Sequence, residues 1–270
     1  MASLTSFSKE ISNSWIIFRS RWRTVIILAL LPIVPFLFTL PYLVNLSQYP
    51  ASELPPLEGS TIIMFALALV ATIATFILRE ISKAGIFISM TNKENVGAKK
   101  ALQLGTQRFP AFLYTEILVI IFVFVTLIPT VLLNYWFVNF GKAFFYPIMN
   151  QLVADLLLLV IAIILLIPVF IIGTWLSFAP LISAVTNNGG LSALTKSVTI
   201  IRPITKRVFK RLIAWTILAS AVSYMVSPLP IAKWLFPFII LLIGTAFLVT
   251  LYKETAVKVK NRSRIRRVAL

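Results

Sequence analysis

The sequence predicts an all-α membrane protein: a helical bundle with six transmembrane helices in three tandem repeats, each an amphipathic helix followed by a helical hairpin. Three observations lead to this fold class. The 270 residues are 59% hydrophobic and only 12% charged, more apolar surface than a soluble domain of this length can bury. Apolar runs of about 20 residues, the length that crosses a bilayer, recur along the chain. Basic residues gather in alternate connections between those runs.

The apolar runs predict the spans in order along the chain. We place them at Thr24–Leu46, Ser60–Leu78, Ala111–Asn134, Leu152–Phe178, Leu212–Pro228 and Trp234–Tyr252. The first run is too long for a signal peptide and follows a basic lead, so we interpret it as a retained span. Pro180 is expected to mark where the fourth helix bends or leaves the bilayer. The spans form one membrane domain, residues 1–252, followed by a basic cytoplasmic tail, residues 253–270.

Lysine and arginine predict the orientation. One side of the predicted topology holds 23 of the 25 basic residues, and the other holds only Lys142 and Lys233. Cytoplasmic connections carry this kind of excess. Both termini are therefore predicted in the cytoplasm, with the protein in the inner (plasma) membrane.

Self-comparison predicts an internal repeat of about 1–92, 93–187 and 188–252, with all three units in the same orientation. Residues 81–92 align with residues 176–187. The identical positions are Ser82, Ala84, Thr91 and Asn92, which match Ser177, Ala179, Thr186 and Asn187. Each copy is followed by a glycine turn and a short helical segment.

Each short helix is predicted to lie on the inner leaflet. Ile11, Trp15 and Phe18 have the spacing of one apolar helix face, and basic residues flank it. Each basic residue near an anionic surface contributes about 1 kcal/mol of binding. The predicted contacts to anionic lipid headgroups are Arg19, Arg108, Arg202, Lys206 and Arg207. The alternative is that these charges only set the topology.

Two carboxylates fall at or inside predicted spans, Glu116 and Asp155. A charge in the lipid core costs about 2.5–3.5 kcal/mol on insertion scales, so such residues mark an ion pair or a pathway. Glu116 lies toward the same inner face as Glu80 and Lys83, which indicates an ion pair between spans. Asp155 is expected in the first turn of the fourth span, where its charge suits the helix dipole. The two residues occupy opposite leaflets and cannot form one acid–base pair.

The chain has no cysteine and no histidine. Thiolate and imidazole chemistry, in catalysis or metal binding, is therefore excluded. Sequence patterns of nucleotide-binding loops, zinc proteases and serine hydrolases are also missing. We predict a protein that is not an enzyme and that has no catalytic residues, metal or cofactor.

One stretch resembles a known family. Leu176-Ser-Phe-Ala-Pro-Leu, then Gly189-Gly-Leu-Ser-Ala-Leu-Thr-Lys-Ser-Val, then Arg202 running into an apolar helix, is similar to the YciC-type bacterial inner-membrane proteins. That family is related to the membrane domain attached to some glycerophosphodiester phosphodiesterases. The resemblance covers most of the chain in span number, basic lead and repeat layout. It implies a multi-pass inner-membrane protein without an agreed biochemical activity, and no catalysis.

These observations favour a non-enzymatic, lipid-associated envelope or scaffold factor whose partners are anionic headgroups of the cytoplasmic leaflet. The basic tail directly follows the last span, which favours a membrane anchor over nucleic-acid binding. The alternative is a small-solute or ion transporter or channel that uses Glu116, Asp155 and proline kinks in the spans. An intramembrane lipid-modifying enzyme is a third hypothesis. The oligomeric state is not predicted.

Overall fold

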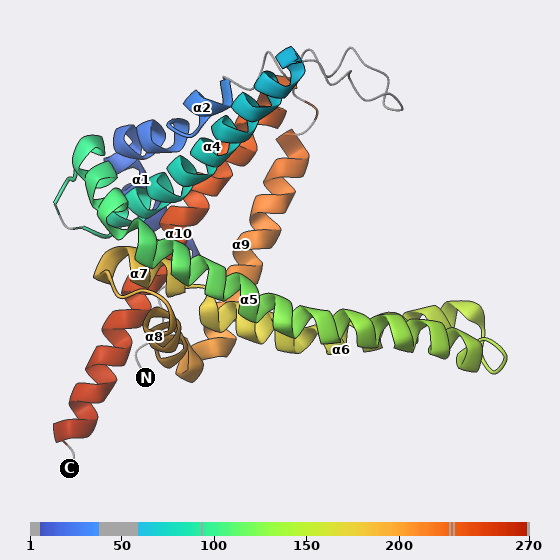
Figure 1. Ribbon diagram of the computed structural model, residues 1–270. Coiled ribbons are helices and arrows are strands. Elements are labelled where there is room, and N and C mark those ends of the chain that lie inside the picture. Colours follow the sequence, from blue (N-terminus) through green and yellow to red (C-terminus); the bar gives the residue numbers. More distant parts are fainter. Residues whose placement is uncertain (1–5, 38–58, 93, 227, 229, 269–270) are drawn as a thin grey trace.

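The computed structural model describes residues 6–37, 59–92, 94–226, 228 and 230–268, and the regular structure in them is entirely helical (Figure 1). In chain order the helices are α1 (Phe7–Leu30), α2 (Ile33–Leu37), α4 (Gly59–Thr91), α5 (Ala98–Phe145), α6 (Gln151–Leu176), α7 (Ala179–Thr186), α8 (Leu191–Ile201), the 3₁₀ turn η1 (Arg202–Ile204), α9 (Thr205–Val226) and α10 (Pro230–Val268).

Five stretches of the described residues are long and apolar enough to cross a membrane. They are Ile62–Thr91, Ala98–Phe145, Gln151–Thr186, Leu191–Val226 and Phe238–Val257. Each overlaps one of the last five predicted spans, and several extend beyond the predicted bounds. The chain thus has the make-up of a multi-pass helical membrane protein. The first predicted span begins in α1 and α2, and its remainder, residues 38–46, lies outside the described residues.

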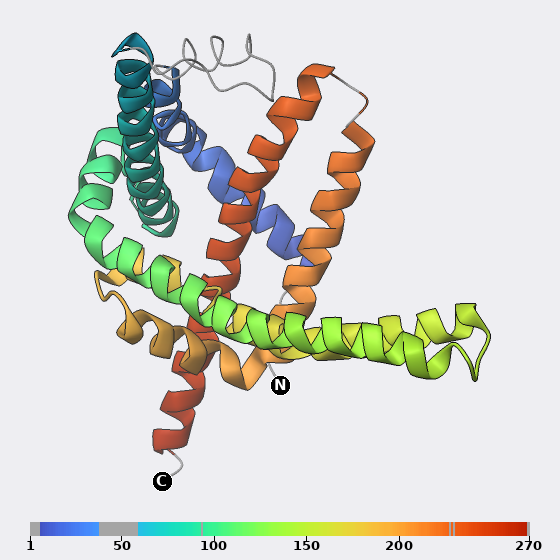
Figure 2. The same cartoon turned by 45° about the vertical axis from the view of Figure 1, so that its right-hand side comes forward.

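The helices are arranged more openly than the predicted bundle. In two views, α4, α9 and α10 run in broadly the same direction, whereas the α5–α6 hairpin projects crosswise from them (Figures 1 and 2). The first half of α5 packs closely on α4, because Gly85 and Gly105 bring the two backbones together at the crossing; a Cβ added to Gly105 would meet the carbonyl oxygen of Ile81 at 2.5 Å. The second half of α5 leaves this crossing together with α6.

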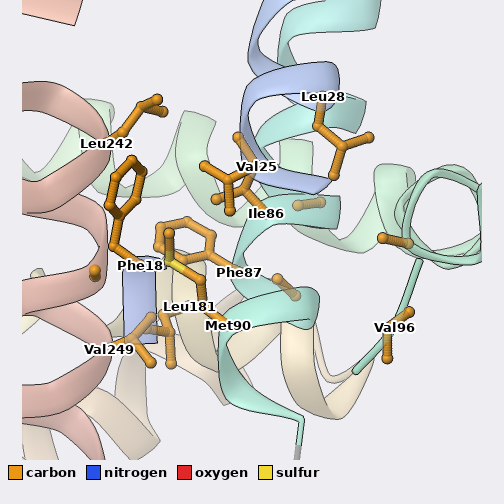
Figure 3. Packing of buried hydrophobic residues seen from close by; sticks show 14 of the residues in the cluster. Phe18, Val25, Leu28, Ile86, Phe87, Met90, Val96, Leu181, Leu242 and Val249 are labelled. Carbon is orange, nitrogen blue, oxygen red and sulfur yellow. The ribbon is translucent and has the colours of Figure 1, made fainter. Parts of the chain in front are cut away.

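The main core lies where α1, α4, α7 and α10 meet. Figure 3 shows Phe18 and Val25 of α1 beside Phe87 and Met90 of α4, with Leu242 of α10 facing them. The structure thus places one side of α1 in the protein core, and the position of this helix on the inner leaflet stays a prediction. Of the predicted apolar face, Phe18 is buried but Trp15 is 48% exposed, because α1 turns a different face to the protein. Tertiary packing against α10, which α1 meets only in the folded chain, selects that face.

The short helix predicted before the third span is not separate. α5 continues without interruption from Ala98 through Pro110 to Phe145. A proline removes one backbone hydrogen bond from a helix, and membrane helices tolerate this loss. In the corresponding place before the fifth span, α8 does end, and η1 with Pro203 separates it from α9.

The two aligned segments end their helices alike. The backbone N–H of Asn92 donates to Ile88 O, and that of Asn187 donates to Ser183 O, both at 3.1 Å. Pro180 stands at the start of α7, just after α6 ends at Leu176, as expected from its position in the sequence. The three-unit repeat itself stays a prediction. At the other end of the chain, α10 continues to Val268, so most of the predicted tail extends the last helix.

Candidate functional site

A buried ion pair joins α1 to α9. Glu10 Oε2 lies 3.0 Å from Arg211 Nη1; the Glu10 side chain is fully buried and that of Arg211 is 17% exposed. The Arg211 guanidinium also lies over the Phe7 ring, 5.7 Å from its centroid. Glu10 is in the first turn of α1, where a negative charge suits the helix dipole. The pair fixes the start of α1 against the protein.

This pair is not among the interactions predicted from the sequence. Glu10 lies outside the predicted spans, where hydropathy gives no reason to suspect a buried charge. Two signals were available: Glu10 is the only acidic residue before Glu53, and it shares a helix face with Ser14 and Phe18. Ser14 is buried and donates hydrogen bonds to Glu10 O at 2.6 Å and to Thr250 Oγ1 at 3.2 Å, which ties α1 to α10 as well.

A hydrophobic groove lies beside this ion pair, between α1, α9 and α10. Its volume is about 250 Å³, and its lining side chains are all hydrophobic. They include Ile11, Trp15, Trp215, Leu218, Phe236 and Ile240. We call it the α1–α9–α10 groove. Trp215 is held in place from behind, stacked on Phe247 with the ring centroids 5.1 Å apart and the planes 14° apart.

Four of the five predicted lipid contacts are exposed. Arg202, Lys206 and Arg207 follow one another through η1 into the start of α9, and Arg19 lies on α1. We call the first three residues the basic turn. The basic turn therefore presents three exposed positive charges within two helical turns.

Arg108, the fifth predicted lipid contact, has a different role in the structure. Its Nη1 donates to Ala184 O at 2.5 Å and to Val185 O at 2.6 Å, at the carboxyl end of α7. A cation there satisfies carbonyls that the helix leaves unpaired and complements the helix dipole. Its guanidinium is therefore engaged with the protein.

Two further cations, which are not among the predicted lipid contacts, donate to backbone carbonyls at the end of α4. Arg21 donates to Asn92 O at 2.7 Å and to Glu94 O at 2.6 Å. Lys253 of α10 donates to Met90 O at 3.0 Å. Part of the basic excess on this side of the molecule thus caps helix ends rather than facing outward.

Glu116 forms the expected ion pair between spans, and its partner is Lys83. The Lys83 Nζ contacts Glu116 Oε1 and lies 4.0 Å from Glu80 Oε2, so one ammonium from α4 lies between two carboxylates. The Glu116 side chain is 14% exposed and that of Lys83 is 42% exposed. The Lys83 Nζ also lies over the Phe112 ring, 5.7 Å from its centroid.

Asp155 lies at the far end of the α5–α6 hairpin. It stands in the second turn of α6, which corrects the prediction of a first-turn residue, because α6 already begins at Gln151. Its carboxylate accepts a hydrogen bond from the Tyr146 hydroxyl at 2.6 Å, and this bond raises the pKa of Tyr146 above its ordinary value. At 1.5 Å per residue, the helix rise puts Glu116 roughly 45 Å from Asp155. The two carboxylates do not share a site.

No family model matches the chain, and neither a curated protein nor a solved structure matches it. In the described residues, no three metal-ligating side chains gather into one group. Function is therefore inferred from the basic turn, the groove and the paired charges.

Proposed function

We propose that this protein is a non-enzymatic multi-pass protein of the bacterial inner membrane that binds anionic phospholipid at its cytoplasmic face and acts as a lipid-associated envelope or scaffold factor. The observation that carries the proposal is the basic turn: Arg202, Lys206 and Arg207 are all exposed, in η1 and the first turn of α9, ahead of the apolar residues that begin at Leu212. The concentration of basic residues on one side of the predicted topology supports a cytoplasmic location for both termini.

The energetics of the basic turn are sufficient for lipid selection. Each basic residue near an anionic membrane surface contributes about 1 kcal/mol. Three together supply about 3 kcal/mol, which is roughly a hundredfold in affinity. Arginine adds directional binding, because its planar guanidinium can donate two parallel hydrogen bonds to one phosphate. The resemblance to the YciC-type family supports the same membrane location but no specific activity.

Measuring the lipids that the purified protein retains tests this proposal. We would replace Arg202, Lys206 and Arg207 with glutamine and compare binding of phosphatidylglycerol and phosphatidylcholine by native mass spectrometry. The matched control replaces three other exposed lysines with glutamine: Lys99, Lys100 and Lys196.

We expect the basic-turn variant to lose phosphatidylglycerol affinity by about ten- to a hundredfold, with a smaller loss in the control, whose lysines cannot make the paired hydrogen bonds of an arginine. Unchanged affinity in the basic-turn variant, or an equal loss in the control, would contradict a lipid site at this position.

A transporter or channel is the second candidate function. The Glu80–Lys83–Glu116 cluster favours it, because charged side chains between membrane-spanning helices can line an ion pathway. However, Glu116 is paired with Lys83 and Asp155 is hydrogen-bonded to Tyr146, and these partners favour structural roles for both carboxylates. Replacing Glu116 with glutamine and Asp155 with asparagine separates the two functions. Unchanged ion and proton flux in vesicles is expected; a lost flux would favour transport.

A further inference from the structure

We infer that the α1–α9–α10 groove holds one acyl chain of an anionic phospholipid whose phosphate is bound by Arg207. This inference rests on the proposed function, because it assigns a place to the lipid that the basic turn attracts. The proposed function places the lipid headgroup at the basic turn; this inference adds a site for an acyl chain of the same lipid.

The groove fits a hydrocarbon chain. Among the residues that the structure describes, its lining is entirely hydrophobic, so water there would find no hydrogen-bonding partners on them. Its volume of about 250 Å³ is smaller than the usual pocket for a whole small molecule, about 300–1,000 Å³, and suits a single chain. Trp15, Leu218 and Ile239 line it and are 48%, 38% and 39% exposed, so the groove is open sideways. A chain can enter from the surrounding bilayer.

The position of positive charge matches a lipid with its chain in the groove. Arg207, Arg211, Trp215, Leu218 and Val222 follow one another on a single stripe of α9, at spacings of three and four residues. Glu10 compensates the charge of Arg211. In the described part of the chain Arg207 has no ion pair. The helix rise puts it about 12 Å from Trp215 along the axis of α9, toward the start of that helix.

A second exposed arginine follows the groove lining on α1. Ile11 and Trp15 line the groove from α1, and Arg19 continues their stripe one turn further. Glu10 pairs with Arg211 at the start of the lining, so Arg207 lies before the lining and Arg19 lies beyond it. The phosphate is therefore assigned to Arg207 alone. An anionic headgroup at Arg207 with a hydrocarbon chain in the groove matches these features; a purely hydrophobic partner helix would leave Arg207 without a counter-charge.

Filling the groove tests the inference. Ala219 lines it, and Ala219→Phe places a ring where the chain would lie. Ala66→Phe adds the same ring at an exposed position on α4 and serves as the matched control. Phosphatidylglycerol binding is measured by native mass spectrometry for both, for Arg207→Gln and for the basic-turn variant. We expect at least a tenfold loss of affinity for Ala219→Phe and about a fivefold loss for Arg207→Gln, with Ala66→Phe unchanged.

The outcomes separate the two proposals. If Ala219→Phe binds phosphatidylglycerol as wild type does while the basic-turn variant does not, the groove is not the chain site and the proposed function stands. If neither variant changes binding, both proposals fail. If Ala219→Phe weakens phosphatidylglycerol and phosphatidylcholine equally, selection for an anionic lipid at the groove is overturned.

A measurement on the wild-type protein covers the case in which Ala219→Phe does not fold. Bromine atoms on a lipid chain quench a tryptophan that they contact, and Trp15 and Trp215 both line the groove. Phosphatidylglycerol with brominated chains should quench tryptophan fluorescence at a lower mole fraction than brominated phosphatidylcholine does. Equal quenching by the two lipids would overturn the inference.

Discussion

At the scale of single residues, Glu10 is the charge whose removal should matter most. Its fully buried carboxylate pairs with Arg211 across α1 and α9. Breaking a buried pair by removing one partner costs about 3–5 kcal/mol, because the remaining charge stays in a low-dielectric site. We expect Glu10→Gln to lower the free energy of unfolding by about that amount, measured by reversible unfolding in mixed micelles.

The control for this prediction is Glu94→Gln, which changes an exposed carboxylate and should leave stability within about 0.5 kcal/mol of wild type. A double variant, Glu10→Met with Arg211→Met, should be more stable than Glu10→Gln, because apolar residues of similar volume can replace a buried pair. A Glu10→Gln protein as stable as wild type would show that the pair contributes nothing.

Gly190 is the second residue with a sharp prediction. It has φ +63°, a conformation that a side chain disfavours, and a Cβ there would collide with the Tyr114 ring of α5. Gly190→Ala should therefore destabilise the protein by about 1–3 kcal/mol. Gly97→Ala is the matched control, since a Cβ there meets nothing within 4 Å. Thermal unfolding of both variants checks this, and equal midpoints would contradict it.

The sequence predicts these residues unevenly. Glu116 is conspicuous because it is a carboxylate inside an apolar run, and in the structure it has the expected basic partner. Glu10 is not conspicuous, because its burial depends on contact with Arg211, which is distant in the sequence. Arg108 looks like one more surface cation in the sequence, although its guanidinium is directed at α7. Hydropathy records where a residue lies along the chain and carries no information on long-range partners.

At the scale of helices, Arg108 is expected to stabilise α7 and not to bind lipid. Two hydrogen bonds from a charged donor reach the last carbonyls of that helix. Arg108→Gln should lower the free energy of unfolding by about 1.5–3 kcal/mol, the range for a charged hydrogen bond. It should leave phosphatidylglycerol affinity unchanged. Arg202→Gln, at an exposed position, should do the reverse, so the pair of variants distinguishes capping from lipid contact.

Helix limits show which sequence signals were reliable. The fourth span, predicted at Leu152–Phe178, appears as α6 at Gln151–Leu176, because its apolar run has turn residues at both ends. The third, predicted at Ala111–Asn134, is part of the much longer α5. Charged and aromatic residues flank the apolar centre of α5. They lower the mean hydropathy, so the predicted span ends at them although the helix continues through them. Helix continuity depends on backbone hydrogen bonds, which hydropathy does not measure.

At the scale of the whole molecule, the topology can be tested directly because the chain has no cysteine. A single cysteine introduced at Asn150, at the exposed tip of the α5–α6 hairpin, should react with a membrane-impermeant maleimide in intact cells. One at Ser192, exposed at the start of α8, should react only after permeabilisation. The cysteine-free wild type provides the background.

Labelling of Ser192→Cys in intact cells would contradict the predicted orientation. Failure to label Asn150→Cys in intact cells would indicate that the hairpin tip does not reach the outer surface. The crosswise direction of this hairpin was not predictable from the sequence (Figure 2). The glycines at the α4–α5 crossing indicate close approach, but the pattern of small residues leaves the crossing direction open.

The contacts of α10 have a consequence for the order in which the protein can be completed during synthesis. Lys253 closes the end of α4, Thr250 accepts from Ser14, and Leu242 packs against the α1 core, yet all three belong to α10, which leaves the ribosome long after α1 and α4. Until α10 is made, α1 has no partner for much of its buried face. A nascent chain arrested before α10 would therefore present α1 and the end of α4 to membrane chaperones and proteases, so the packing of α1 is completed only when α10 has been synthesised.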